Sequence, residues 1–213
     1  MAIISRDYLY IFICTPGTGS TATENTLITH YKGQYIENNH FPYTLSKHFS
    51  LAELLDKKIL QKEKINNYNV FTTVRNHYDY FVSEWIRHRN WSKLLEDQNS
   101  WVHQHDDAKE RISKAMTSTF SEYLMFRLRN TPDNSYLYKH FWVDAHYIMK
   151  IENLDEDFRK VLNNIGITFF HNIEKINVTE NKSNSYKCYY DDESRILIYK
   201  KFMDEILFFG YEF

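Results

Sequence analysis

The stretch Tyr8-Leu-Tyr-Ile-Phe-Ile-Cys14, followed at once by Thr15-Pro-Gly-Thr-Gly-Ser-Thr-Ala22, decides the fold of this chain. Residues 8–14 form a short apolar and aromatic run that is typical of a buried strand. The loop combines two glycines with hydroxyl side chains, and residues 23–31 have the pattern of a helix. Backbone N–H groups of such a loop and the dipole of the following helix point at one place. The segment therefore predicts an anion site between a strand and a helix.

The loop lacks the lysine that nucleoside triphosphatases carry in the corresponding loop, and this limits which kind of anion site it can form. The loop of a nucleoside triphosphatase reads G-x-x-x-x-G-K-[ST], but here Gly19 is followed by Ser20 and Thr21. Only 5 glycines occur in the chain, and Gly17 and Gly19 are two of them. In so glycine-poor a chain, this pair marks a place where the backbone approaches a ligand closely. We expect phosphate binding without Walker-type chemistry.

Length, charge and cysteine content limit the other possibilities. A chain of 213 residues can form one α/β domain with a full core, and no repeat or linker divides residues 1–213. The formal net charge of -2 gives no case for a nucleic-acid or membrane partner. The two cysteines, Cys14 and Cys188, predict free thiols. Because we find neither a secretory signal nor an apolar run of membrane-spanning length, we expect a cytoplasmic protein.

Strand and helix patterns alternate along the rest of the chain. Further strands are expected at 69–75, 146–151 and, more weakly, 43–46, and helices at 50–61, 78–95, 108–128, 154–165 and 191–208. Ser50 and Glu53 predict a capping box at the start of the first of these helices. The alternation predicts a P-loop-like parallel β-sheet flanked by helices, in three α/β/α layers. Ligands of such sheets bind beyond the carboxyl ends of the strands.

Residues 75–83, Arg-Asn-His-Tyr-Asp-Tyr-Phe-Val-Ser, are the second informative segment. Arg75 leaves the end of a strand, and Ser83 lies inside the following helix. A guanidinium offers a planar fork for a phosphate, and a serine adds a hydroxyl donor. Each also has a plainer interpretation, since Arg75 could pair with Asp79 and Ser83 could be an ordinary helix residue. Together they indicate a second anion site, as a nucleotide with phosphates at two positions requires.

With these two segments the chain resembles the sulfotransferases that use 3′-phosphoadenosine 5′-phosphosulfate (PAPS). Their first motif, P-K-T-G-[TSG]-[TS]-[SA], matches Pro16-Gly17-Thr18-Gly19-Ser20-Thr21-Ala22, and their second, V-R-[ND]-P-x-[DE]-x-x-x-S, matches residues 74–83. Residues 152–158, Glu-Asn-Leu-Asp-Glu-Asp-Phe, and the tail 190–213 are similar to the bacterial and Golgi-type carbohydrate branch. The resemblance implies the sulfotransferase fold, PAPS as co-substrate and no metal ion.

The resemblance also implies roles for single residues. Arg75 and Ser83 would hold the 3′-phosphate. Lys182 lies in a polar loop, near the place where a loop of the family closes over the nucleotide. It is either a further contact to the 3′-phosphate or a plain surface lysine. The sulfuryl group would pass to a hydroxyl of a carbohydrate or another small acceptor. The 5′-phosphosulfate would be held by the loop residues Pro16, Gly17, Thr18, Gly19, Ser20, Thr21 and Ala22.

Two positions depart from the family pattern. His77 replaces a proline that mainly stiffens a turn, so we expect little effect on the chemistry. Gly17 stands where many members carry a lysine that contacts the leaving phosphate and the sulfuryl group. Either another cation, Lys47 or Lys32, takes that role, or the chain is a catalytically weak or inactive protein that binds PAPS or its product PAP. A small-molecule kinase is a further alternative, which the missing Walker lysine disfavours.

A general base must take the proton of the acceptor hydroxyl near neutral pH, which suits a histidine or a tuned glutamate. Lys47 and His48 stand side by side in a stretch that looks like the K-H-x-S-x-x-E/A segment of the same branch, where the histidine is implied to be the base. We predict His48 as the base, with His40 and Glu37 as alternatives.

Two more segments admit a functional interpretation. Residues 103–107, His-Gln-His-Asp-Asp, bring metal-ligand types together, but the implied chemistry needs no metal, and we expect a solvated loop or a lining of the acceptor site. Residues 85–91, Trp-Ile-Arg-His-Arg-Asn-Trp, are aromatic and basic. Either Trp85 packs inward with Arg87 and Arg89 in solvent, or the segment contacts an anionic or sugar acceptor.

Overall fold

The computed structural model describes residues 2–36, 47–176, 178–183 and 185–213. Within these ranges a five-stranded sheet has the order β3-β1-β2-β4-β5. Its strands are β1 (Ile3–Ser5), β2 (Tyr10–Ile13), β3 (Gln34–Tyr35), β4 (Asn69–Val74) and β5 (Tyr147–Lys150). Strands β2, β4 and β5 pair in parallel, as the alternation of strands and helices predicts.

The prediction of a purely parallel sheet is wrong at β1, which pairs antiparallel with both β2 and β3. Only residues 6–9 separate β1 from β2. So short a connection forms a hairpin, because a parallel pair needs a crossover of a dozen or more residues. The chain therefore has an α/β fold with a mixed sheet, in which β1 runs against the other four strands.

The predicted helices occur in the predicted order with different boundaries, and the short helices at 62–65 and 139–142 were not predicted. The predicted helix at 108–128 is two helices, because Thr119 and Glu122 form a capping box that starts a new one. The capping box predicted from Ser50 and Glu53 is confirmed. The weak strand predicted at 43–46 lies outside the described residues. The helices are α1 (Ser20–His30), α3 (Leu51–Asp56), α4 (Lys62–Ile65), α5 (His77–Asn90), α6 (Asp106–Thr117), α7 (Phe120–Leu128), α8 (Lys139–Trp142), α9 (Leu154–Asn164) and α10 (Asp192–Phe208).

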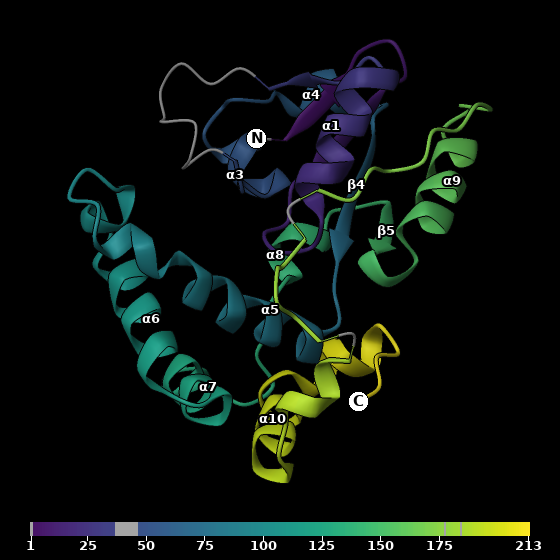
Figure 1. Cartoon of the computed structure of the whole chain (residues 1–213). Helices are drawn as coiled ribbons and strands as arrows, with labels where there is room; N and C mark the ends of the chain where they lie inside the picture. Colours follow the sequence, from purple (N-terminus) through teal and green to yellow (C-terminus); the bar gives the residue numbers. More distant parts are fainter. Residues whose placement is uncertain (1, 37–46, 177, 184) are drawn as a thin grey trace. The chain divides into compact units, whose positions relative to one another are not determined.

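Two compact units make up the chain (Figure 1). The first unit comprises Met1–Arg75 and Tyr138–Asn177 and contains the whole sheet. The second comprises Asn76–Leu137 and Val178–Phe213 and contains α5, α6, α7 and α10. Each unit is assembled from two separate parts of the chain. The expectation that residues 1–213 form a single domain stays a prediction.

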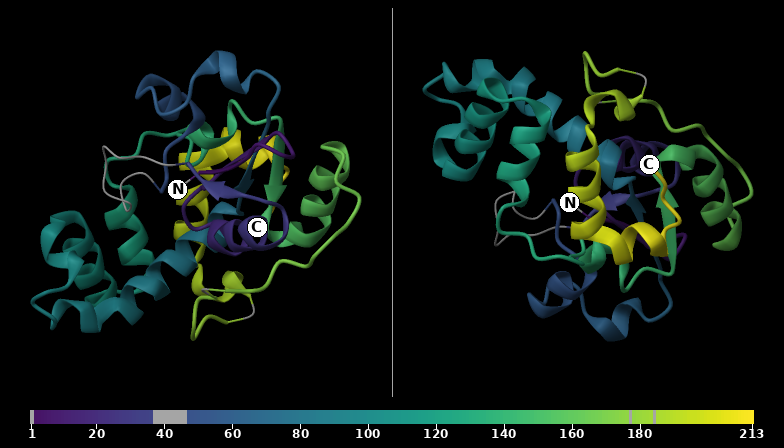
Figure 2. Two further views of the ribbon diagram at one scale, coloured as in Figure 1. Left: turned by 90° about the horizontal axis from the view of Figure 1, so that it is seen from above. Right: turned by 90° about the horizontal axis from the view of Figure 1, so that it is seen from below.

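The first unit carries helices on both faces of its sheet, as predicted. Side chains alternate along a strand, so Tyr10 and Phe12 of β2 join one apolar cluster while Ile11 and Ile13 join another. Helices α1 and α9 cover the first face, and both views of Figure 2 show them side by side. Helices α3 and α8 cover the second face, through Leu54 and Phe141.

The second unit is assembled around α5. Apolar side chains of α5 pack against α7 and α10, with Phe81, Phe120 and Phe202 in one cluster. At the first turn of α5, His77 Nε2 lies 2.9 Å from Glu205 Oε2 of α10, and both side chains are fully buried. His77 therefore ties the start of α5 to α10.

A buried polar network also joins α5 to α7. The Arg127 guanidinium donates two hydrogen bonds of 3.0 Å to the Glu84 carboxylate, and the Tyr123 hydroxyl donates a third of 3.2 Å. His88 Nδ1 lies 2.7 Å from that hydroxyl. Burial lowers the pKa of His88 to about 4, although Glu84 opposes the shift. Burial disfavours the charge of Glu84, but Arg127 outweighs it and holds the pKa of this carboxyl below its usual range.

We predict that His88 makes the second unit less stable in acid. An unfolded histidine has a pKa of about 6.5, so between that pH and about 4 the unfolded chain binds more protons than the folded one. The free energy of unfolding therefore falls as the pH falls, by about 2 kcal/mol between about pH 7.5 and about pH 5. Urea unfolding followed by tryptophan fluorescence measures this loss. The same pH dependence in His88→Gln would contradict the prediction.

Candidate anion site

The loop after β2 begins a site within the first unit. Gly17 and Gly19 both have left-handed backbone, with φ of 74° and 75°, which glycine adopts without strain. Gly19 is the N-cap of α1, and among the described residues no side chain caps this end and no acidic residue lies in the first turn. The N–H groups at this helix end therefore point toward a place that suits an anion.

Threonine hydroxyls fasten this loop to β4. Thr18 Oγ1 donates to the Thr15 carbonyl oxygen at 2.8 Å and lies 2.6 Å from Thr73 Oγ1. Thr15 Oγ1 lies 2.7 Å from Thr72 Oγ1, and all four side chains are fully buried. The hydroxyl of Thr18 therefore holds the loop in shape. The groups suited to contact a ligand are the backbone N–H groups of the loop and the side chains of the residues next to Thr18.

The segment after β5 packs against the same loop. A Cβ atom at Gly19 would lie 3.0 Å from Ile151 Cδ1 and 3.7 Å from Leu154 Cδ2. Ile151 belongs to the short 3₁₀ helix η3 (Ile151–Asn153), and Leu154 begins α9. Leu154, within the stretch 152–158 singled out in the sequence, therefore lies beside the anion loop, and Ile151 just before that stretch crowds any side chain at residue 19.

Arg75 reaches the loop from the end of β4. Its Nη1 donates a hydrogen bond of 3.0 Å to the Gly17 carbonyl oxygen, and the residue is 9% exposed. The structure thus brings Arg75 and the loop to one end of the sheet, as expected for the carboxyl ends of two parallel strands. The plainer interpretation, a pair between Arg75 and Asp79, stays a prediction; Asp79 forms an ion pair with Lys182.

Lys47 and His48 lie at the N-terminal end of α1. Lys47 Nζ donates to Thr21 Oγ1 at 3.2 Å. His48 Nδ1 lies 2.8 Å from the Cys14 carbonyl oxygen. Because a carbonyl can only accept, Nδ1 carries the proton and Nε2 carries the lone pair of the neutral ring. Burial lowers the pKa of His48, which the bond to Cys14 opposes and the charge of Lys47 reinforces.

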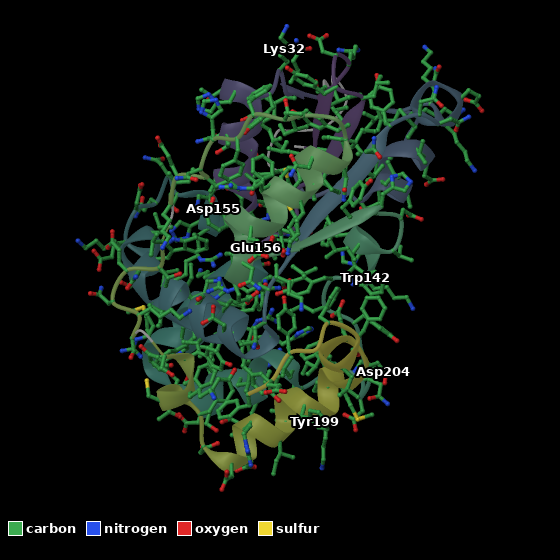
Figure 3. The ribbon with its side chains drawn as sticks, turned by 90° about the vertical axis from the view of Figure 1, so that its right-hand side faces the viewer. Lys32, Trp142, Asp155, Glu156, Tyr199 and Asp204 are labelled. Atoms are coloured by element: carbon green, nitrogen blue, oxygen red, sulfur yellow. The ribbon has the colours of Figure 1, made fainter. Side chains whose placement is uncertain are left out.

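Of the two lysines expected to supply a cation in place of Gly17, Lys47 is the one at the loop. Lys32 follows the last turn of α1, at the other end of this helix, and pairs with Asp7 at 3.1 Å with a side chain that is 66% exposed (Figure 3). The 11 residues of α1 span roughly 16 Å at about 1.5 Å per residue. Lys32 is therefore too far from the loop to act there.

Glu24 is a functional candidate that the sequence reasoning missed. It is 2% exposed on α1, and its carboxylate accepts hydrogen bonds from the Tyr35 hydroxyl at 2.6 Å and the Cys14 thiol at 3.6 Å. Lys47 Nζ lies 3.9 Å from the same carboxylate. Glu24 thus positions Lys47 beside the loop. No sequence pattern marks it, because its partners are Cys14 just after β2, Tyr35 of β3 and Lys47, and only the folded chain brings these together.

Ser83 and Lys182 belong to the second unit. Ser83 is fully buried on α5, and Lys182 forms an ion pair with Asp79, one turn before Ser83. Their predicted contacts to a 3′-phosphate stay predictions. His40 and Glu37, the alternative bases, lie outside the described residues.

Two findings concern metals and membranes. Across the described ranges, no three histidine, cysteine or acidic side chains gather where they could hold a metal ion, His103 and His105 included. In the same part of the chain, no helix combines the length and the apolar character that crossing a membrane requires.

No protein-family model, no curated protein and no solved structure matches this chain. The structure itself defines the class: an α/β protein with a mixed sheet flanked by helices, in which a glycine loop joins β2 to α1.

We predict that Gly19→Ala costs more stability than Gly166→Ala. Both glycines have positive φ, 75° and 84°, so each substitution carries backbone strain of about 1–2 kcal/mol. At Gly19 the new Cβ also meets Ile151 at 3.0 Å, whereas nothing lies within 4 Å at Gly166, so Gly19→Ala costs about 1–3 kcal/mol more. Urea unfolding followed by circular dichroism compares the two variants. Equal losses would contradict the packing argument.

Proposed function

We propose that this protein is a PAPS-dependent sulfotransferase that transfers the sulfuryl group to a hydroxyl of a carbohydrate or another small acceptor. The observation that carries the proposal is one arrangement in the first unit: an uncapped helix end behind a glycine loop, with Lys47 at 3.2 Å from Thr21 and a neutral His48 beside it. The order of the four motifs along the chain supports the same function.

Binding of the donor rests on the charge of the 5′-phosphosulfate. Loop N–H groups and the positive end of the α1 dipole attract this anion. Lys47 supplies the cation that Gly17 does not, and Glu24 holds it in place. A cation there stabilises the negative charge that grows on the phosphate as the sulfuryl group leaves.

The transfer itself is an in-line displacement. The acceptor oxygen attacks sulfur, its proton passes to His48 Nε2, and the bond between sulfur and the bridging phosphate oxygen breaks. The electron pair of that bond stays on the phosphate, so the products are a sulfate ester and PAP. The Cys14 carbonyl holds the imidazole in the tautomer that has its lone pair on Nε2, which is how an orienting group serves a general base.

The main rival is a protein that binds PAPS or PAP without turnover, and Gly17 in place of the lysine favours it. The two proposals share the nucleotide and differ in the chemistry. Binding and turnover must therefore be measured separately.

We predict that PAP binds and ATP binds more weakly in isothermal titration calorimetry. Loss of one charged hydrogen-bond donor costs about 1.5–3 kcal/mol, so Lys47→Met weakens PAP binding by about tenfold or more. Lys32→Met is the matched control, because Lys32 lies at the far end of α1 and should bind PAP like the unaltered chain. Tight binding of ATP without binding of PAP would overturn the proposal.

We predict that His48→Asn lowers turnover of radiolabelled PAPS by about 10²–10⁴-fold and leaves PAP affinity intact. The asparagine amide keeps a donor for the Cys14 carbonyl and removes the base. Because the pKa of His48 lies below its usual range, kcat/KM should be level above neutral pH and fall only in acid, where the ring becomes protonated. Unchanged turnover in the variant would remove His48 as the base. If the unaltered chain binds PAP but transfers sulfate to no acceptor and not to water, the binding-only rival holds.

A further inference from the structure

A groove in the second unit has no part in the proposed transfer. It has a volume of about 590 Å³ and is lined by Trp85 and Arg89 of α5, Phe120 of α7, and Tyr189 of the 3₁₀ helix η4 (Tyr186–Tyr189). Residues 116–119, at the junction of α6 and α7, complete the lining. All of these elements lie in the second unit, three of them marked in Figure 1. The second unit therefore forms the groove by itself.

Aromatic rings give this groove its shape. The Trp85 ring meets the rings of Phe120 and Tyr189 edge to face, with centroids 5.7 Å and 6.0 Å apart. Met116, 47% exposed, adds a flexible apolar side chain. Rigid aromatic walls with an adaptable thioether suit a flat, apolar ligand body.

Arg89 gives the groove its charge, since it is the one charged side chain among the described residues that line it. Its guanidinium lies over the Trp85 ring, 4.9 Å from the centroid, and Nη1 donates to the Ala115 carbonyl oxygen at 3.1 Å. A guanidinium has five N–H donors, so one such bond leaves others for an anion. The indole N–H of Trp85 is buried and has no acceptor among the described residues.

The hydroxyls of the groove are already engaged. Ser118 Oγ donates to the Lys114 carbonyl oxygen at 2.6 Å, and Thr117 Oγ1 donates to the Ser113 carbonyl oxygen at 3.0 Å. Thr119 caps α7 through the backbone N–H of Glu122. A sugar needs many hydrogen-bonding partners, and the protons of these three hydroxyls are already donated at the ends of α6 and α7. The lining therefore favours an apolar ring with an anionic group over a polyhydroxyl ligand.

We propose that this groove binds a planar aromatic anion. Its ring system packs against the surface that Trp85, Phe120 and Tyr189 form, and its anionic group accepts hydrogen bonds from Arg89. For the segment 85–91, the proposal thus selects the anionic ligand from the two that the sequence suggested. A sugar is disfavoured in this groove.

Naphthalene-2-sulfonate is the probe, with neutral 2-naphthalenemethanol and inorganic sulfate as matched ligands. The full chain, labelled with ¹⁵N, is titrated while the indole N–H signals are followed by NMR, with Trp85→Phe assigning the Trp85 signal. We expect the sulfonate to shift this signal and to bind at least about tenfold more tightly than either matched ligand. An unmoved Trp85 signal, or equal binding of the neutral ligand, would overturn the proposal.

Substitutions of Arg89 and Arg87 distinguish specific recognition of the sulfonate by Arg89 from a general effect of positive charge on the second unit. Arg89→Gln should weaken sulfonate binding by about tenfold or more, because it removes the charge-assisted donor. Arg87→Gln is the control, since it makes the same change two residues away at a side chain that does not line the groove, and it should alter binding less than about twofold. Arg89→Lys keeps the charge and tests folding, because its unfolding curve shows whether loss of the bond to Ala115 disturbs the unit. Equal weakening by Arg87→Gln, or full binding by a folded Arg89→Gln, would refute the site.

Discussion

The parallel pairing of β2 with β4 is the constraint on which the rest of the first unit depends. It places Thr15 and Thr18 against Thr72 and Thr73, and these buried hydroxyls satisfy one another and the nearby backbone. A loop held this way keeps its two left-handed glycines and presents the start of α1 in one fixed orientation. The same pairing brings Arg75 to the Gly17 carbonyl oxygen. A site for a ligand needs such rigidity, because an N–H group that must reorganise contributes little binding energy.

The loop between β2 and α1 contains no charged residue, so the charges around it come from other segments and from the backbone. With no lysine of its own and no acidic residue in the first turn of α1, its positive potential comes from backbone dipoles. Lys47 adds a cation from another segment, and Glu24 lies buried behind it. A buried carboxylate is costly unless it is paired and hydrogen-bonded. Tyr35, Cys14 and Lys47 meet that requirement together, so the cation and its support form one arrangement.

The second unit is held together by buried polar groups as well as by aromatic packing. The pair of His77 and Glu205 and the network around Glu84 both link α5 to other helices. Removing one member of such a network leaves a buried polar group unsatisfied, which is why these residues specify how the helices align. The buried His77 anchors the first turn of α5 to α10.

The sequence by itself determined the parts whose signals are local. Apolar runs predicted β2, β4 and β5, and the turn chemistry of residues 15–22 predicted the loop and the helix after it. The strands β1 and β3 have only 3 and 2 residues, too few for a periodic pattern to show. Thr119 and Glu122 form the capping box that separates α6 from α7, but the helical pattern on both sides of them led to the prediction of one long helix.

Only the tertiary structure decided that Lys47, rather than Lys32, meets the loop, that Cys14 selects the tautomer of His48, and that Glu24 supports them. The reason is physical: a hydrogen bond between residues far apart in the sequence depends on how strands pair and helices pack, and no short stretch of residues encodes that.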